Sequence, residues 1–175
     1  EGRDQHRGWV PSWVILRLPA NGAPSYKTVL TNGLMVDADR EKHSKSEQTQ
    51  GGQAQPRTSA AYAGEYGAHI VRVWVASQDF RNDITVSNER IKKVAETYRN
   101  LRNALRYQLS NLYDFDPATD AVPDDALTGL DRWILDQFAA VQRDVTEAYE
   151  RFEYHVVYQR ISQFVAVELS AIYHD

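Results

Sequence analysis

The chain has 175 residues, of which 42% are hydrophobic and 25% are charged, a balance typical of a soluble globular protein with one or two small domains. No apolar run approaches the roughly 18 residues that a membrane span needs, and the N-terminus lacks a signal-peptide pattern. The absence of cysteine excludes disulfides and thiolate metal sites. We therefore expect a cytoplasmic protein without a membrane partner, and the first residue, Glu1 rather than Met, suggests a piece of a longer chain.

The charges are unevenly distributed, although the net charge of −4 is too small to indicate a nucleic-acid surface by itself. Residues 88–107 are mostly basic, and residues 114–153 are mostly acidic. A basic segment of helical length can face phosphate groups. The alternative, a solvated helix face, is the commoner meaning of a charge run.

The first third predicts a helix followed by a strand. The stretch "WVILRL" has helical character, whereas "KTVLTNGLMV" is apolar and β-branched and reads as a strand. Asn32-Gly33 interrupts that strand, at a point where the backbone could approach a ligand closely. Residues 47–63 have no apolar period and are interpreted as a loop or linker.

Periodicity returns after Gly67. The segment "AHIVRVWVAS" fits either a strand or a helix, and the sequence leaves its type open. Ser87 is a good N-cap for a long amphipathic helix, with Glu89 in the first turn. The apolar row of that helix steps by three and four residues: Ile91, Val94, Tyr98, Leu101, Leu105, Leu109 and Leu112. At about 100° per residue, a second row beside it is basic: Lys92, Arg99, Arg102 and Arg106.

Two further helices are expected after the proline- and aspartate-containing segment 114–123. One covers the apolar residues between Leu127 and Ala148, and the other begins near Tyr154 and continues through Ile172. Short connections would force the three long helices into an antiparallel bundle. The predicted fold class is therefore mainly α, with a partial α/β part at the N-terminus.

The stretch "EKHSKS", residues 41–46, is a candidate polyphosphate-binding loop. Lys42 and Lys45 supply compact positive charges, and the serine hydroxyls and backbone N–H groups add donors. Composition alone favours the alternative, a solvated turn. The N-terminal "EGRDQHRGW" combines carboxylates, an amide and two glycines at a predicted strand-to-helix turn, where α/β folds commonly hold ribose and ammonium groups. A charged turn in which Trp9 only packs remains the alternative. The histidines show no spacing for a metal pair.

Five segments together resemble the bacterial type of isoleucyl-tRNA synthetase, in that family's order and over nearly the whole chain: "EGRDQHRGW", "YKTVLTNGL", "KHSKS", "YGAHIVRVWVASQDFRNDITVS" and "YRNLRNALRYQLSNLYDFDP". The related valyl and leucyl enzymes share the lysine loop, but their counterparts of "DQHRGW" and "WVASQDFRNDI" differ. The resemblance therefore favours isoleucine.

The resemblance implies a class I enzyme whose Rossmann-type catalytic domain uses ATP with Mg²⁺ to convert L-isoleucine to the adenylate, and then transfers it to tRNA(Ile). It implies that Lys42 and Lys45 are the catalytic lysines of the signature loop, with Lys45 the stronger ATP contact. It assigns adenylate contacts to Glu1, Gly2, Asp4 and Gln5, and the isoleucine pocket to Trp9. The helices from Ser87 onward would belong to the anticodon-binding bundle, and the basic row would contact the tRNA backbone. The parent enzyme would be a monomer, with zinc only in a C-terminal region outside these residues.

The resemblance also predicts the domain boundaries. Residues 1–46 would end the catalytic domain, 47–66 would form a divergent linker, 67–87 a junction, and 88–175 an incomplete anticodon-binding domain. His43 stands where the family usually has Met, and Glu47-Gln48 replaces a usual Gly-Asn. The His-x-Gly-His half of the nucleotide fold is absent from these residues. We therefore expect the isolated chain to be inactive. The alternatives are a non-catalytic tRNA-binding helical module and a degenerate fragment whose half-sheet does not fold.

Overall fold

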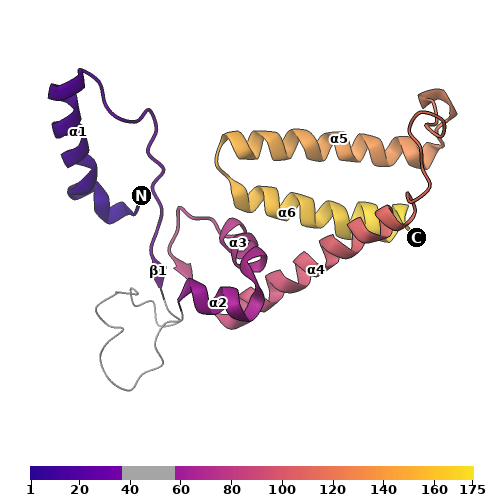
Figure 1. The fold of residues 1–175 in the computed structure, drawn as a ribbon, viewed down its shortest axis with the longest axis horizontal. Coiled ribbons are helices and arrows are strands. Elements are labelled where there is room, and N and C mark those ends of the chain that lie inside the picture. Colours follow the sequence, from indigo (N-terminus) through magenta and orange to yellow (C-terminus); the bar gives the residue numbers. More distant parts are fainter. Residues whose placement is uncertain (37–57) are drawn as a thin grey trace. The chain divides into compact units, whose positions relative to one another are not determined.

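The computed structural model describes residues 1–36 and 58–175, which form helices and one small parallel sheet (Figure 1). The elements in chain order are η1 (Arg3–Arg7), α1 (Trp9–Asn21), β1 (Met35–Val36), α2 (Ser59–Tyr66), α3 (Ala68–Ala76), β2 (Ile84–Thr85), α4 (Asn88–Ser110), η3 (Asp124–Ala126), α5 (Gly129–Glu150), α6 (Tyr154–Phe164) and the π-helix η4 (Val165–Tyr173). They divide into two compact units, residues 1–58 with 79–87, and residues 59–78 with 88–175. This mainly helical fold with a small α/β part confirms the coarse fold class.

The first unit is built on three parallel stretches of backbone. Gly2 pairs with Asn32 in an isolated parallel bridge, and β1 pairs in parallel with β2, Met35 opposite Ile84. The stretch containing Asn32 and β1 therefore lies between the other two. The predicted strand is confirmed only at these positions, because residues 27–31 form no strand.

Helix α1 connects the first two of these parallel stretches and confirms the helix predicted before the strand. It begins after Gly8, and Pro11 is tolerated because it stands in the first turn, where a backbone N–H needs no helical partner. It ends at Gly22, whose φ of +69° is the left-handed conformation that glycine adopts without a steric penalty. None of its side chains is buried.

Gly33 makes a close backbone approach, as the sequence suggested, but its neighbour is protein. A Cβ atom at Gly33 would overlap the backbone carbonyl of Asn82, and the Gly33 N–H donates to the Phe80 carbonyl at 2.8 Å. The expectation that a ligand would approach here is therefore wrong. The glycine lets the segment 80–83 lie directly against the central stretch.

In the second unit, the segment left open between strand and helix is the helix α3. It follows Gly67 and packs against α2 and α4, with Trp74 buried. Helix α4 begins directly after Ser87, as predicted. The alternation of β-branched residues in α3 suits a strand, but packing on two neighbouring helices determines its conformation.

Helices α5 and α6 form a hairpin and run side by side in opposite directions (Figure 1). The turn is a Schellman motif, because the Glu153 N–H donates to the Ala148 carbonyl at 2.8 Å and the Phe152 N–H donates to the Tyr149 carbonyl at 3.0 Å. The helix predicted from Tyr154 continues through Tyr173, with its last nine residues in π-helical form.

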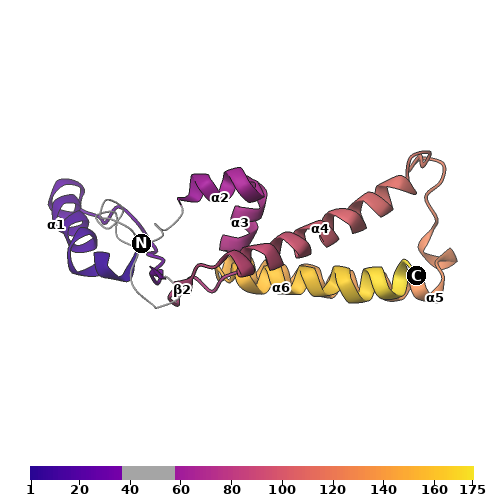
Figure 2. The ribbon, with the colours of Figure 1, turned by 90° about the horizontal axis from the view of Figure 1, so that it is seen from below.

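The core of the second unit lies where α4, α5, α6 and η4 meet. Its buried side chains are Ala104, Ile134, Val141, Phe164 and Leu169. Helix α4 is inclined to α6 and η4 and contacts η4 (Figures 1 and 2). The connection from α4 to α5 occupies residues 111–128, so the expectation of short connections is wrong for this pair of helices.

The apolar row predicted for α4 is buried only in its first part. Ile91 and Val94 are buried, but Leu105 and Leu109 are 59% and 69% exposed, and Ala104 lies in the core instead. The small Ala104 side chain allows the backbone of α4 to approach η4. The buried face therefore turns around the helix, and the leucines at its C-terminal end face solvent.

No helix in residues 1–36 or 58–175 is both long and apolar enough to cross a membrane.

Candidate functional site

The N-terminal residues are held by backbone hydrogen bonds to the central stretch of the first unit. The Asn32 N–H donates to the Glu1 carbonyl at 2.9 Å, and the Arg3 N–H donates to the Asn32 carbonyl at 3.1 Å. The Glu1 backbone nitrogen also donates to the Leu30 carbonyl at 2.8 Å. The first three residues therefore form a short strand-like edge, and η1 starts at its carboxyl end.

Three of the predicted adenylate-contacting residues, Gly2, Asp4 and Gln5, lie together at this carboxyl end, and the fourth, Glu1, begins the edge. Gly2 is the N-cap of η1, and the Gln5 N–H donates to the Gly2 carbonyl at 2.9 Å. A Cβ atom at Gly2 would lie 2.6 Å from the Asp4 carboxylate, so the carboxylate rests against the Gly2 backbone. Asp4 and Gln5 are both half-buried. The absence of a side chain at Gly2 thus leaves room for the Asp4 carboxylate at the end of this edge.

Further contacts, which the sequence did not indicate, join the N-terminal edge to the stretch that contains β2. Arg3 forms an ion pair with Asp83 at 2.9 Å, and the other oxygen of Asp83 accepts from the Leu34 N–H at 2.8 Å. His6 and Thr31 share a hydrogen bond of 2.7 Å. Asp83 therefore links all three stretches. In the sequence, Asp83 is marked only by its place in the segment "DFRNDI", which is part of the family resemblance. Its contacts with Arg3 and Leu34 have no local pattern, because these residues are far apart in the chain.

Trp9 begins α1 and is 52% exposed. Its ring packs edge-on against the ring of Trp13 one turn later, with 5.7 Å between centroids. Trp9 therefore presents much of its indole outside the packed part of the first unit.

Lys42 and Lys45 lie outside the described residues, as do His43 and Glu47. The segment that contains them follows directly after β1, at the carboxyl end of the central stretch. The chain therefore enters the lysine segment from the same end of the parallel stretches at which η1 starts.

The described residues contain no group of three or more His, Asp or Glu side chains that could hold a metal ion.

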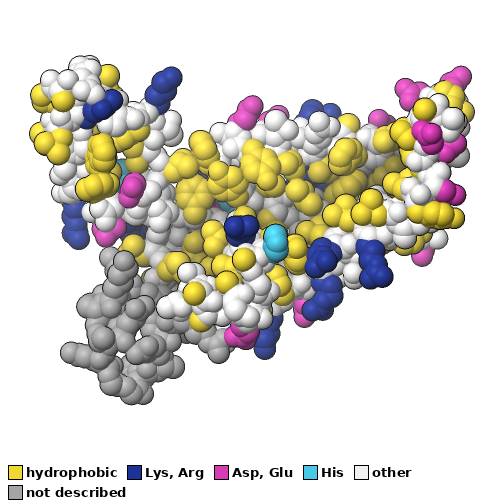
Figure 3. Space-filling view, in the orientation of Figure 1, with side chains coloured by type: hydrophobic (Ala, Val, Ile, Leu, Met, Phe, Trp, Pro, Cys, Tyr) yellow, Lys and Arg dark blue, Asp and Glu magenta, His cyan; other side chains and the backbone are white. Residues whose placement is uncertain are grey.

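The basic row is exposed along α4: Lys92, Arg99, Arg102 and Arg106. We call these four residues the basic stripe. Figure 3 shows Lys and Arg side chains gathered along this helix. The guanidinium of Arg102 lies 5.8 Å from the ring centroid of Tyr98, and the ring of His69 on α3 stacks on Tyr98 at 6.3 Å. The stripe is thus a one-sided positive surface with an ordered aromatic ring at its edge.

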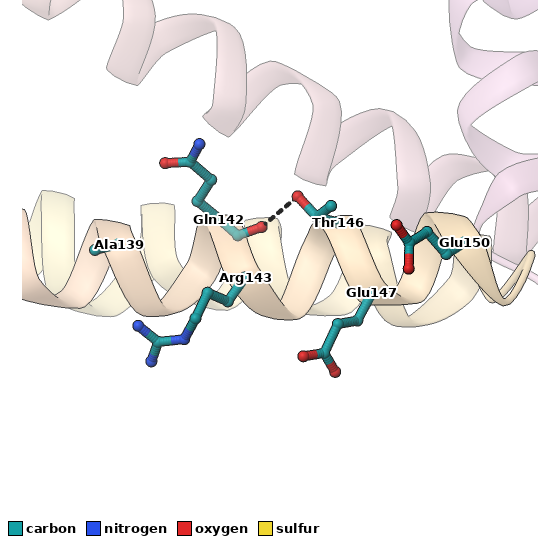
Figure 4. Close-up of a pocket in the computed structure, with 6 residues that line it drawn as sticks. All are labelled: Ala139, Gln142, Arg143, Thr146, Glu147 and Glu150. Atoms are coloured by element: carbon teal, nitrogen blue, oxygen red, sulfur yellow. Dashed lines mark hydrogen bonds between the residues drawn. The ribbon is translucent and has the colours of Figure 1, made fainter.

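A shallow hollow on α5 carries no comparable chemistry. Figure 4 shows that all of its lining residues come from this one helix, among them Gln142, Thr146 and Glu147. The Thr146 hydroxyl donates to the Gln142 carbonyl of its own helix at 2.7 Å. One helix face cannot enclose a ligand, so we assign no site there.

Comparison with known proteins agrees with both halves of the chain. The family of class I tRNA synthetases (I, L, M and V) matches residues 1–87, and the anticodon-binding domain of tRNA ligase matches residues 131–175. The chain belongs to the class I aminoacyl-tRNA synthetases, the family of enzymes for isoleucine, leucine, methionine and valine.

Within that class, similar proteins include isoleucine–tRNA ligases of several bacteria. The chain is 48% identical to the enzyme of Symbiobacterium thermophilum over 176 residues, and 43% identical over 175 residues to those of Nitrosococcus oceani and Geobacter sulfurreducens. Each match covers 100% of this chain and 18% of the relative. The resemblance to the isoleucyl-tRNA synthetases is thereby confirmed, and the chain spans about a fifth of the length of these relatives.

Proposed function

We propose that this chain is a segment of an isoleucine–tRNA ligase, in which the first unit contributes to amino-acid activation and the second unit to tRNA binding. The observation that carries this proposal is the identity of 48% and 43% to isoleucine–tRNA ligases over the whole chain, not over one domain alone. The reaction is ATP-dependent activation of L-isoleucine, followed by transfer to tRNA(Ile).

The arrangement of the first unit supports a nucleotide-binding role of Rossmann type. The stretch at Gly2, helix α1 and the stretch at Asn32 form a parallel β–α–β arrangement, and ligands of such folds bind beyond the carboxyl ends of the strands. Four residues stand at or next to such an end and would contact the adenylate: Glu1, Gly2, Asp4 and Gln5. Trp9 would line the isoleucine side-chain pocket with its exposed indole face.

The lysines have an electrostatic role in the proposal. As the isoleucine carboxylate attacks the α-phosphorus, negative charge moves onto the departing pyrophosphate, and the ammonium groups of Lys42 and Lys45 would stabilise it. Mg²⁺ would supply further charge neutralisation when it is bound with ATP. The route of the chain supports this role, because the lysine segment leaves from the end of β1.

The second unit would serve the tRNA as part of an antiparallel anticodon-binding bundle. Its basic stripe is exposed and points to one side of α4, which suits contact with a phosphate backbone. Replacing all four residues with glutamine should weaken tRNA binding and reduce the slope of log affinity against log salt. A control variant replaces four exposed arginines outside α4 with glutamine: Arg72, Arg132, Arg143 and Arg151. Unchanged affinity and slope in the stripe variant would remove the stripe from the interface.

The isolated chain should not activate isoleucine, because it lacks the His-x-Gly-His half of the nucleotide fold. The test is isoleucine-dependent exchange of pyrophosphate into ATP, with an intact isoleucine–tRNA ligase as positive control. Detectable exchange by the 175-residue chain would refute this part of the proposal.

A non-catalytic tRNA-binding module remains the second candidate. It is favoured by the division of the structure, in which the helices of residues 59–78 and 88–175 form a compact unit by themselves. Under this candidate the second unit binds tRNA, while the first unit and the lysine segment add nothing to catalysis even when the rest of a ligase is supplied.

A further inference from the structure

The ion pair between Arg3 and Asp83 joins the two outer stretches of the first unit. Arg3 belongs to the N-terminal edge, Asp83 directly precedes β2, and the central stretch with Asn32 and β1 lies between them. The Arg3 guanidinium donates to one carboxylate oxygen of Asp83 at 2.9 Å, and the other oxygen accepts from the Leu34 N–H at 2.8 Å. One carboxylate therefore holds the N-terminal edge from the far side of the central stretch.

Arg3 stands at the point where the N-terminal edge ends and η1 begins. Its N–H still donates to the Asn32 carbonyl at 3.1 Å. The next residue, Asp4, already belongs to η1 and rests its carboxylate against Gly2. A rotation of the backbone at Arg3 would therefore displace two of the predicted adenylate contacts together.

The ion pair is better suited to positioning than to stability. The side chains of Arg3 and Asp83 are 58% and 38% exposed, and exposed ion pairs contribute little to the free energy of unfolding. Catalysis is more sensitive to position, because a displacement of about 1 Å near a reacting group can lower a rate by about 100-fold. Loss of the pair can thus affect a rate strongly and folding only weakly.

We propose that Arg3 and Asp83 are positioning residues for isoleucine activation. Their ion pair holds the end of the N-terminal edge and thereby sets the place of Gly2 and Asp4 beside the adenylate. Both side chains act through the backbone at which η1 begins, and neither contacts the reacting atoms. This inference rests on the proposed activation function and deepens it, because the resemblance assigned no role to Arg3 or Asp83.

The test measures isoleucine-dependent pyrophosphate exchange by an intact ligase, in which this chain replaces the matching 18% of the Symbiobacterium thermophilum enzyme. Arg3→Gln and Asp83→Asn each remove the ion pair, and the new asparagine keeps an oxygen that can accept from the Leu34 N–H. Each substitution should lower kcat by about tenfold and change the KM for ATP by less than about twofold.

Two further variants test whether the two residues act as a pair. The double variant Arg3→Gln with Asp83→Asn should be no slower than the slower single variant, because both substitutions break the same interaction. Arg3→Lys keeps the positive charge and should retain most of the rate. Additive losses in the double variant, or an Arg3→Lys variant as slow as Arg3→Gln, would overturn the role of the ion pair.

The matched control is Arg81→Gln. Arg81 pairs with Asp79 at 2.7 Å, and the two side chains are 53% and 29% exposed, so this pair resembles that of Arg3 and Asp83 in chemistry and exposure. It joins residues two positions apart in one segment of the chain. Arg81→Gln should therefore leave the exchange rate unchanged and shift the urea midpoint no more than the test variants do.

Hydrogen exchange in the 175-residue chain tests the positioning without the reaction. The Arg3 N–H should exchange faster in Asp83→Asn than in the parent or in Arg81→Gln, because one restraint on the N-terminal edge is lost. An unchanged exchange rate of this amide would overturn the positioning role, whatever the effect on kcat.

The outcomes separate this inference from the proposed function. If the intact ligase is active and its Arg3→Gln and Asp83→Asn variants match it, the positioning role is overturned and the function stands. If these variants lose more stability in urea than Arg81→Gln does, the ion pair is structural and the inference also falls. A ligase without any exchange contradicts the proposed function, and the positioning role falls with it.

Discussion

The hydroxyl group of Tyr173 donates a hydrogen bond of 2.9 Å to the carboxylate of Asp131, and this bond joins the end of η4 to the first turn of α5. Asp131 also completes a capping box with Thr128, whose backbone N–H donates to the carboxylate at 3.0 Å. One carboxylate therefore both caps α5 and holds the last turn of the chain against it.

This pair predicts how stability changes with pH at both extremes. The Thr128 hydroxyl, and then the Tyr173 hydroxyl, lower the pKa of Asp131. The stabilisation by Asp131 is therefore present above its ordinary pKa of about 4 and is lost as the pH falls through the lower pKa of the folded state. The hydrogen bond to Asp131, and then burial, raise the pKa of Tyr173. Its contribution is present below about pH 10 and is lost as the pH rises through the raised pKa.

The variant Tyr173→Phe should lower the urea midpoint at neutral pH, flatten the alkaline loss of stability and reduce the acid loss. The measurement is a series of urea unfolding curves across the pH range. Tyr158→Phe is the control, because Tyr158 is also partly buried on the same continuous helical stretch. Equal effects of the two substitutions would contradict the role of the Asp131 hydrogen bond.

Because Ala104 and not Leu105 faces the core, substitutions at these two neighbouring positions of α4 should affect stability differently. Ala104→Leu should destabilise the second unit by about 1–3 kcal/mol, because the larger side chain must fit between α4 and η4. Leu105→Ala should change the free energy of unfolding by less than about 0.5 kcal/mol, because Leu105 is mostly exposed. Urea unfolding measures both. If Leu105→Ala lowers the free energy of unfolding more than Ala104→Leu does, the buried face of α4 is the one expected from the leucine spacing.

Gly33 predicts a stability effect in the first unit. In Gly33→Ala the new methyl group would overlap the backbone of Asn82 and Asp83, which cannot move aside as a flexible side chain could. The substitution should therefore open the pairing of β1 with β2. Hydrogen exchange would show this as lost protection of the Ile84 N–H, which donates to the Leu34 carbonyl at 2.8 Å.

The matched glycine substitution is Gly129→Ala, because a Cβ atom there meets nothing within 4 Å. It should leave exchange in the first unit unchanged and stabilise α5 by up to about 1 kcal/mol. If Gly33→Ala also leaves the Ile84 amide protected, the close approach of the two backbones is not needed for the pairing.

The sequence predicted the helices better than it predicted their contacts. Helices α4, α5 and α6 follow from spacing and capping residues, which are local. The pairing of Leu34 with Asp83 joins positions far apart in the chain, and no local pattern marks it. The burial of Ala104 instead of Leu105 depends on how closely η4 approaches, which the spacing of leucines does not encode.

The candidate sites show the same difference between local features, which the sequence predicted, and contacts between distant residues, which it did not. The quoted N-terminal motif located the turn at which Gly2, Asp4 and Gln5 meet, and helical spacing placed the basic stripe on one exposed side of α4. The contact between the rings of Tyr107 and His174 could not be predicted, because His174 follows a helical stretch that begins more than 40 residues after Tyr107. The roles of Lys42 and Lys45 stay predictions, since their segment lies outside the described residues.

The most direct test of the central claim is a chimera in which this chain replaces the matching 18% of the Symbiobacterium thermophilum isoleucine–tRNA ligase. The account predicts isoleucine-dependent pyrophosphate exchange by the chimera, and a loss of at least about 100-fold in kcat when Lys45→Ala is added, as expected for a group that stabilises transition-state charge. A chimera that folds and binds tRNA but shows no exchange, or whose exchange is indifferent to Lys45→Ala, would contradict it and favour the non-catalytic module.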